Sequence, residues 1–442
     1  MSAASETMKI LFVNDTENHY HWGCTGTSLA LKEKIQDLGF EIIPVSIKST
    51  KTWTTWGTNT PRTVEEFKDE QVFTDFCNRN PELITQLKSA DALVINGEGT
   101  IHGGLRANPL NLLYFAYIAR RFFLKHVEII NHSVYPEDFS STQSRPDFSI
   151  PQSDSDKKTV QDLYKMVYET LDYVAIREPI SLAIAENWNL TRRPTLSFDC
   201  MPLYIRDHYT RKKASSNTIV IAGSVAWEEA AMPALGQYIR QQLEQGYVVK
   251  ILIGAKADPA QDDANFVECL ERTLGDTWQK VSVIDAQSLD EWLETIENAA
   301  LLVSGRFHYS IAAACLETPF VALNSNTLKI HGLMNILEMP EPLIYENPEN
   351  LYQQLIERTE TALGTTPKNY TQTLCELAEN NFSGLKALHA VESDPPTVLF
   401  ALWLARGQDP QLRAIGETGA STTVGSPGST VGSPGSSPRG HS

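Results

Sequence analysis

The chain alternates between short apolar segments and longer amphipathic segments along most of its length. The first half starts with an apolar segment at 9–14 (KILFVN), and similar segments follow at 41–47, 91–96 and 127–131. Between them lie segments with apolar residues at helical spacing, such as the one at 111–123. Strands that alternate with helices are typical of βαβ units, which build largely parallel sheets. The pattern therefore predicts an α/β fold.

The same alternation restarts after a polar and basic segment at 206–217. It continues through apolar segments at 218–224, 247–254 and 281–286 to a last one at 299–303. Two sets of alternating strands and helices, joined by a polar segment, predict two Rossmann-like domains.

These patterns set the expected domain boundaries. We predict an N-terminal domain over 8–205, a linker over 206–217, a C-terminal domain over 218–345 and further helices over 346–410. Residues 411–442 are rich in Gly, Ser, Thr and Pro, and the heptapeptide TVGSPGS occurs there twice. Such a composition cannot bury enough apolar surface to fold, so we expect a disordered tail.

Charge and cysteine usage exclude several classes of protein. The net charge of −17 argues against nucleic acid as a partner, because binding to it relies on a basic surface. The six cysteines lie far apart without a CxxC pair, which fits a reducing compartment. We find no signal peptide, and the longest apolar run, at 398–405, is too short for a transmembrane segment. We therefore expect a cytoplasmic protein.

Arginines and histidines recur where predicted strands end. His132 and Arg177 each follow a predicted strand, and Arg306 and His308 lie between a predicted strand and a predicted helix. In open parallel sheets ligands bind at the carboxyl ends of the strands, and helix N-termini favour anions. Each residue taken alone has a structural alternative, an ion pair with a neighbouring carboxylate or a place in the core. Their recurrence in an acidic chain predicts a site for a small anion.

A glycine-containing segment, NGEGTIHGG at 96–104, follows another predicted strand. His102 stands where the dinucleotide fingerprint GxGxxG has its third glycine, so the segment does not predict a nicotinamide cofactor. Gly97 and Gly99 have the alternative role of forming a tight turn with positive φ. Glu98 and His102 are not needed to turn a chain, and they favour a loop that lines a ligand site.

The loop after the first predicted strand is a second candidate for lining a cleft. It starts at Asn14 and contains Asp15, His19 and His21, which are residue types that bind metals. Without a second cluster of ligands we expect no metal, and a loop that lines a substrate cleft. The chain also lacks a nucleophile elbow, a P-loop and an HExxH motif, which disfavours serine hydrolases, kinases and zinc proteases.

Three parts of the sequence resemble the polysaccharide pyruvyl transferase family. They are NGEGTIHGG at 96–104, AIREPIS with SFDCMP within 175–202, and VSGRFHYSIAAACLETPFVALNSNTLKIHGLM at 303–334. The resemblance covers about 9–336, and Arg-x-His with Lys329 some twenty residues later is its most specific part. It implies two Rossmann-like domains that face a cleft, as in GT-B glycosyltransferases. It also implies phosphoenolpyruvate as the donor, without a metal or a nicotinamide cofactor.

The resemblance further implies roles for individual residues. Arg177, Arg306 and His308 would bind the donor together with Lys329. The chemistry agrees, because guanidinium groups bind carboxylate and phosphate in a bidentate manner and histidine moves protons near neutral pH. We expect His308 to be the general acid and His132 a second proton carrier or an acceptor-site residue. The residues expected to line the cleft on the acceptor side are Asn14, Gly97, Glu98, Gly99 and His102.

The expected activity is transfer of pyruvate from phosphoenolpyruvate to a sugar of a glycan precursor as a cyclic ketal, with release of phosphate. Such chemistry would serve exopolysaccharide or cell-envelope synthesis, in the cytoplasm or at the inner face of the membrane, on a free, lipid-linked or nucleotide-linked acceptor. Two alternatives stay open. A nucleotide-sugar-dependent glycosyltransferase would release a nucleoside diphosphate, and a non-catalytic carbohydrate-binding protein would show no turnover.

Overall fold

The computed structural model describes most of the chain, namely residues 7–19, 21–53, 60–102, 105–135, 154–214, 216–254, 260–345 and 348–393. Both sheets belong to one compact unit, Met1–Lys386, and the remaining residues form a second unit, Ala387–Ser442. The helices predicted over 394–410 and the tail predicted over 411–442 lie outside the described residues.

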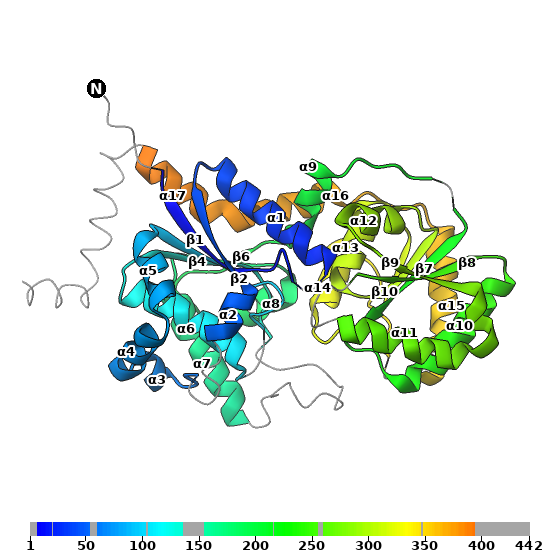
Figure 1. The fold of residues 1–442 in the computed structure, drawn as a ribbon, viewed down its shortest axis with the longest axis horizontal. Helices are drawn as coiled ribbons and strands as arrows, with labels where there is room; N and C mark the ends of the chain where they lie inside the picture. The colour runs from blue at the N-terminus through cyan, green and yellow to red at the C-terminus, as the bar shows by residue number, and fades with distance from the viewer. Residues whose placement is uncertain are drawn as a thin grey trace, which may run out of the picture. The chain divides into compact units, whose positions relative to one another are not determined.

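The first half of the compact unit contains a parallel sheet of six strands (Figure 1). Its strand order is β2-β1-β3-β4-β5-β6. The strands are β1 (Lys9–Asp15), β2 (Glu41–Ser46), β3 (Ala92–Asn96), β4 (His126–His132), β5 (Tyr173–Ile176) and β6 (Thr195–Leu196). All five residues of β3 are buried, as expected for a central strand with both faces covered.

The second half contains a parallel sheet of five strands, in the order β11-β10-β7-β8-β9. The strands are β7 (Thr218–Ser224), β8 (Val248–Ile253), β9 (Val281–Asp285), β10 (Leu301–Gly305) and β11 (Phe320–Ala322). In each sheet the first strand of the half has a neighbour on both sides: β1 pairs with β2 and β3, and β7 pairs with β8 and β10. These are the switch points at which parallel sheets bind ligands. The prediction of two parallel α/β sheets is confirmed.

Helices connect the strands within each half. In the first half they are α1 (Trp22–Asp37), α2 (Ile47–Trp53), α3 (Val64–Lys68), α4 (Glu70–Arg79), α5 (Pro81–Ser89), α6 (Ala107–Arg121), α7 (Asp154–Thr170), α8 (Pro179–Glu186) and α9 (Met201–His208). In the second half they are α10 (Met232–Glu244), α11 (Ala260–Leu274), α12 (Leu289–Glu297), α13 (Phe307–Cys315) and α14 (Lys329–Leu337). Three more helices follow: α15 (Pro348–Gly364), α16 (Thr371–Glu379) and α17 (Ser383–Ser393). No described helix is long and apolar enough to cross a membrane.

Helix α1 begins five residues before the position predicted from the sequence, at Trp22 instead of about Thr27. Its two early glycines suggested a loop, but both are helical and allow close packing. A Cβ atom on Gly23 would lie 2.2 Å from Cβ of His308, and one on Gly26 would lie 2.4 Å from Sδ of Met201. The start of α1 therefore packs directly against α13 of the second half, as Figure 1 shows.

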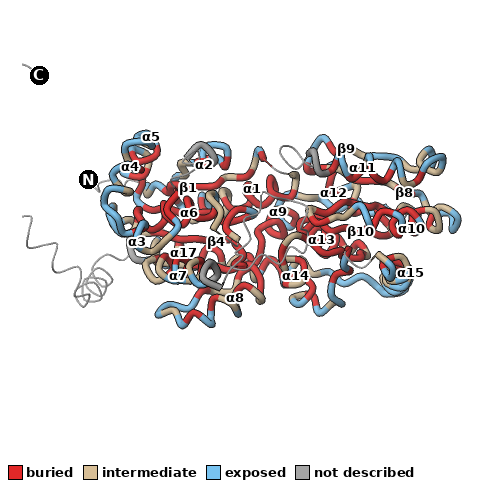
Figure 2. The backbone as a smooth tube through the Cα atoms, turned by 90° about the horizontal axis from the view of Figure 1, so that it is seen from below, coloured by how far each residue is buried: buried red, intermediate tan, exposed pale blue. Residues whose placement is uncertain are grey.

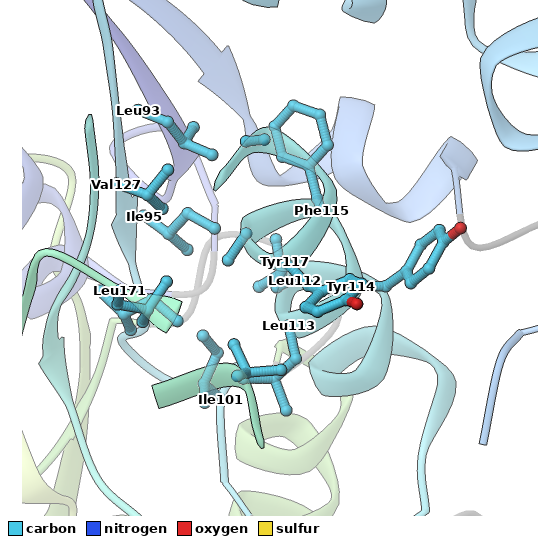
Figure 3. Close-up of a cluster of buried hydrophobic side chains, with 14 of the residues drawn as sticks. Leu93, Ile95, Ile101, Leu112, Leu113, Tyr114, Phe115, Tyr117, Val127 and Leu171 are labelled. Carbon is cyan, nitrogen blue, oxygen red and sulfur yellow. The ribbon is translucent and has the colours of Figure 1, made fainter. Parts of the chain in front are cut away.

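Buried segments run through both halves (Figure 2), and each sheet has its own apolar core. In the first, Leu93, Ile95 and Val127 of the strands face Leu112 and Phe115 of α6 (Figure 3). The second core is formed by side chains from β7, β8, β10, α10, α11 and α15. Because each sheet is packed by its own helices, the loops at the strand ends are available for the functional site.

The chain crosses between the halves in two places. The predicted linker at 206–217 begins inside α9, and beyond it Tyr209 donates a hydrogen bond to Glu297 of α12 at 2.9 Å. At the C-terminal side, α15 packs on α10, whereas α16 packs on α9. Asn381, just after α16, accepts a hydrogen bond from the Asn131 backbone at 2.8 Å. The last helices are therefore divided between the two sheets.

Candidate active site

The Arg-x-His segment lies between β10 and α13, as the sequence pattern predicted. Arg306 is the N-cap residue of α13, and His308 lies in the first turn of that helix. The Arg306 backbone N–H donates to Oγ of Ser304 at 3.0 Å. The guanidinium group of Arg306 forms a buried ion pair with Asp263 of α11. Both residues of the motif are thus fixed at the carboxyl end of a central strand.

His308 reaches out of the second half into a ring of polar groups from the first. Its Nε2 atom lies 3.1 Å from Oδ2 of Asp199, 3.3 Å from Oε1 of Glu98 and 3.4 Å from Oγ1 of Thr27. The side chain is only 5% exposed. One ring nitrogen therefore faces two buried carboxylates, so its hydrogen has two competing acceptors.

Asp199 is the most densely bonded carboxylate of the site. Its Oδ1 atom accepts from Oγ1 of Thr27 at 2.7 Å and from the Met201 N–H at 2.9 Å. Its Oδ2 atom accepts from Nη1 of Arg177 at 3.1 Å, in addition to its contact with His308. Burial alone raises the pKa of Asp199, but the positive charges and donated hydrogen bonds outweigh it and hold the pKa well below its usual range. The carboxylate is therefore ionised at neutral pH.

Arg177 directly follows β5, at the predicted strand end. Its Nε atom donates to Oγ of Ser133 at 3.1 Å, and its guanidinium carbon lies 4.9 Å from the centre of the Phe307 ring. The ion pair of Arg177 is with Asp199, not with the adjacent Glu178, which caps α8. Stacking and a buried ion pair fix this guanidinium at the boundary of the two halves.

Lys329 and His102 lie in the same charged region. Burial is the main reason why the pKa of Lys329 is lowered to about 8, and Arg177 and Arg306 lower it further. Burial also holds the pKa of His102 well below its usual range, together with Arg106, Lys329 and Arg177. The neutral His102 ring accepts from Nη2 of Arg106 at 2.8 Å. The structure therefore brings Arg177, Arg306 and Lys329 together from three elements of both halves.

The glycine-containing loop after β3 is held by Asn14, a buried residue with φ of 67°. The Nδ2 atom of Asn14 donates to the Asn96 carbonyl at 2.6 Å and to Oγ1 of Thr100 at 3.1 Å. Gly99 has the positive φ of the turn, 66°, whereas Gly97 allows close packing, because a Cβ there would lie 2.3 Å from Cβ of His132. Asn14 and both glycines thus shape the loop.

Glu98 points from this loop into the site. It accepts hydrogen bonds from Oγ1 of Thr16 and from Sγ of Cys24, each at 2.8 Å. Its Oε1 atom is also the one near His308. Glu98 is 1% exposed, so the loop contributes a buried carboxylate to the site as well as a turn.

The surroundings of His132 favour a structural role over that of a proton carrier, and its role at the acceptor site stays a prediction. It is the last residue of β4 instead of the first residue beyond it, and it is fully buried. Its ring hydrogen-bonds the hydroxyl of Tyr168. Burial, with a contribution from Arg177, lowers the pKa of His132 to about 3, so the ring is neutral at physiological pH. This environment agrees with the structural alternative, a core histidine.

His308 belongs to two groups of side chains that have the chemistry of metal ligands and ligand atoms within 4.8 Å of one another. The groups are His308 with Glu98 and Asp199, and His308 with His21 and Cys24. The Asp199 oxygen nearest to His308 already accepts from Arg177, and a guanidinium charge beside it opposes a second cation. We therefore assign these groups to a hydrogen-bonded network. The absence of a metal requirement stays a prediction.

Two carboxylates of the site were missed by the sequence reasoning. Asp199 lies in the SFDCMP segment. The signal that could have identified it is its position just before a helix that has a proline in its first turn. Asp263 lies inside α11, where no local pattern distinguishes it from other acidic residues. Its pairing with Arg306 depends on tertiary packing alone.

Comparisons with known proteins agree with this geometry. The family model described as polysaccharide pyruvyl transferase matches residues 27–327, a range that includes Arg177, Asp199, Arg306 and His308 but ends two residues before Lys329. A search of curated proteins finds no match.

Among solved structures, the fold is similar to that of UDP-N-acetylglucosamine 2-epimerases. The putative enzyme from Listeria monocytogenes has 11% identity and a TM-score of 0.51, with 88% of this chain and 98% of that chain covered. The UDP complex of MnaA from S. aureus has 11% identity and a TM-score of 0.52, with 88% and 99% covered. The UDP-GlcNAc-bound 2-epimerase from Neisseria meningitidis has 11% identity and a TM-score of 0.51, with 86% and 99% covered. At this identity the likeness shows a shared GT-B-like fold alone.

The family match covers about two-thirds of the sequence and includes the residues that converge at the site, so the chain belongs to the polysaccharide pyruvyl transferase family.

Proposed function

We propose that the protein transfers the pyruvyl group of phosphoenolpyruvate to two hydroxyl groups of one sugar in a glycan precursor. The product is a cyclic pyruvate ketal, and phosphate is released. Membership of the family supports pyruvyl transfer to a polysaccharide. The observation that carries the choice of donor is the proximity of three cations: the buried Arg177 and Arg306 lie close enough to the partly buried Lys329 to lower its pKa.

The cations match the two anionic ends of the donor. Phosphoenolpyruvate carries a carboxylate and a phosphate, which suit the planar fork of arginine and the point charge of lysine. Without a ligand each arginine is paired with a buried carboxylate, Arg177 with Asp199 and Arg306 with Asp263. These carboxylates hold the guanidinium groups in place, so little side-chain entropy is lost when the donor binds.

His308 is suited to supply the proton that the reaction requires. It donates a proton to C3 of the donor, which builds positive character at C2 and allows the first sugar hydroxyl to add there. The proton lost by this hydroxyl restores the one that His308 gave away. The second hydroxyl then displaces phosphate from C2, and its proton leaves with the phosphate. Two C–O bonds to the sugar form, one C–O bond to phosphate breaks, and no oxidant is needed.

An assay of donor and product identity tests the proposal. The purified protein is incubated with phosphoenolpyruvate and a panel of free, lipid-linked and nucleotide-linked sugars, and free phosphate and ketal formation are measured. A parallel reaction contains UDP-GlcNAc and measures release of the nucleoside diphosphate. We expect phosphate release that depends on both phosphoenolpyruvate and a sugar. Release of nucleoside diphosphate instead, or sugar binding without any turnover, would replace the proposal with one of the two alternatives.

A further inference from the structure

We propose that Asp199 is a positioning residue that links donor binding at Arg177 to the proton held by His308. The part that concerns the reaction rests on the function proposed above. The part that concerns the hydrogen-bonded network rests on the geometry alone.

A single oxygen of Asp199 makes the link. Its Oδ2 atom lies 3.1 Å from Nη1 of Arg177, which follows β5, and 3.1 Å from Nε2 of His308, which starts α13. The other oxygen is held by Thr27 of α1 and by the backbone N–H of Met201. Four donors from four segments thus fix a fully buried carboxylate. Such a group cannot turn away to follow either partner.

This geometry fixes the orientation of the His308 ring. The side chains of titratable or charged residues that face the ring are His21, Cys24, Glu98 and Asp199, with Arg177 on the far side of Asp199. The Asp199 oxygen 3.1 Å from Nε2 accepts a hydrogen bond from this nitrogen, which fixes the tautomer and the direction of the N–H. Glu98 adds negative charge at 3.3 Å. Asp199 is distinguished from Glu98 because it also binds an arginine of the donor site.

Donor binding changes how the charge of Asp199 is shared. When an anionic group of the donor binds Arg177, the guanidinium hydrogen bonds are divided between the donor and Asp199. The Asp199 charge then acts more strongly on His308, so the ring holds its proton more tightly when the donor is present. By linkage, a protonated ring must favour the donor to the same extent.

The Asp199→Asn variant tests this role. The amide keeps the size of the side chain and leaves one oxygen for Thr27 and Met201, but its NH₂ group faces Arg177 and His308 and cannot accept from them. We expect kcat to fall by roughly 10²-fold. We also expect the pH above which activity is lost to move down by about one unit. A merely structural role would lower the melting temperature without moving this pH.

Glu128→Gln is the matched control. Glu128 is a fully buried carboxylate of β4 that lies 2.7 Å from Nε2 of His126. Like Asp199→Asn, this replacement converts a buried carboxylate beside a histidine into an amide. Glu128 and His126 both belong to β4 and lie outside the site. We expect a change in melting temperature but the wild-type pH profile.

If Asp199→Asn fails to fold, Thr27→Val removes one of the four hydrogen bonds and keeps the carboxylate. It should lower kcat less and leave the profile in place.

NMR titration of the histidine rings separates this inference from the proposed function. The His308 signal is assigned by its loss in His308→Gln, and it is followed without donor and with phosphoenolpyruvate. We expect the ring to lose its proton at a lower pH in Asp199→Asn, and at a higher pH in the wild type when the donor is bound. If the wild type releases no phosphate but the variant shifts the titration without donor, the network stands and the proposed function fails. If the wild type is active and neither the titration nor the pH profile moves, the role of Asp199 is refuted.

Discussion

At the scale of single residues, environment decides what a histidine can do. His132 and His308 both lie where a strand ends, yet His132 is enclosed by the first core with a tyrosine hydroxyl as partner. His308 instead faces two carboxylates. Burial, with a contribution from Arg177, lowers the pKa of His132 to about 3 and leaves its ring neutral. Sequence position alone could not separate the two residues.

The contrast between these histidines gives a first prediction. His308→Gln should lower turnover by roughly 10² to 10⁴ while the fold persists and donor-induced thermal stabilisation persists at least in part. His132→Leu leaves the Tyr168 hydroxyl buried without its partner, at a cost of about 1–3 kcal/mol, and should keep the specific activity of the folded protein. Melting temperature and phosphate release, measured for both variants, check this. Near-native turnover in a folded His308→Gln protein would remove this histidine from the mechanism.

Arg306→Lys tests the geometry of the donor site. Lysine keeps the positive charge opposite Asp263 but not the planar fork that binds two oxygens at once. We expect kcat/KM for phosphoenolpyruvate to fall by roughly 10- to 100-fold, which matches the loss of one good charge-assisted hydrogen bond. The melting temperature should stay within a few degrees of the wild type. Steady-state kinetics over a range of donor concentrations check this, and an unchanged KM would place the donor elsewhere.

Lys329 should make donor binding depend on pH. Its pKa is lowered to about 8, so the ammonium group is charged below this pH and loses its charge as the pH rises through it. We expect KM for the donor to rise between pH 7 and pH 9. Lys329→Met should have a raised KM at pH 7 that changes less over this range. A wild-type KM that stays constant up to pH 9 would contradict a role of Lys329 in donor binding.

At the scale of elements, the alternation of apolar and amphipathic segments predicted the described strands except the short β6 and β11, and it predicted many of the helices. It failed at the start of α1, because glycine in a sequence signals a turn as readily as a close contact. Gly23 is helical and lies against His308. The site was predictable where residues follow a strand, as with Arg177 and Arg306. It was not predictable for Asp263, whose partner is forty-three positions away.

Gly23→Ala tests this contact between elements. The new methyl group would lie 2.2 Å from Cβ of His308, so α1 or α13 must shift, at a cost of about 1–3 kcal/mol. We expect a lower melting temperature and reduced turnover, because the ring of His308 moves relative to its carboxylates. Gly364→Ala is the control, since no atom lies within 4 Å of the added Cβ. Equal behaviour of the two variants would show that the contact does not control the site.

At the scale of the whole molecule, the fold does not specify the reaction. The chain shares its architecture with UDP-N-acetylglucosamine 2-epimerases at 11% identity, and a shared fold at this identity does not carry over an activity. The parallel sheets followed from the sequence pattern, but the pairing of loops across the halves did not. That pairing depends on contacts such as the one from the Trp22 ring N–H to the Ala286 carbonyl at 2.8 Å, which no local pattern encodes.

Because both halves contribute to the site, the donor should stabilise both. Phosphoenolpyruvate at 100 times its Kd should add about 2.7 kcal/mol to the free energy of unfolding. Hydrogen exchange should slow in 175–181, which contains Arg177, and in 304–316, which contains Arg306 and His308. NAD and UDP-GlcNAc should produce neither effect, because the glycine-containing loop is not a dinucleotide fingerprint and the proposed donor is a small molecule with one carboxylate and one phosphate. Treatment with a chelator should change neither the donor-induced stabilisation nor turnover. Protection confined to one segment would mean that the donor contacts one half only, and the shared site would then have to be abandoned.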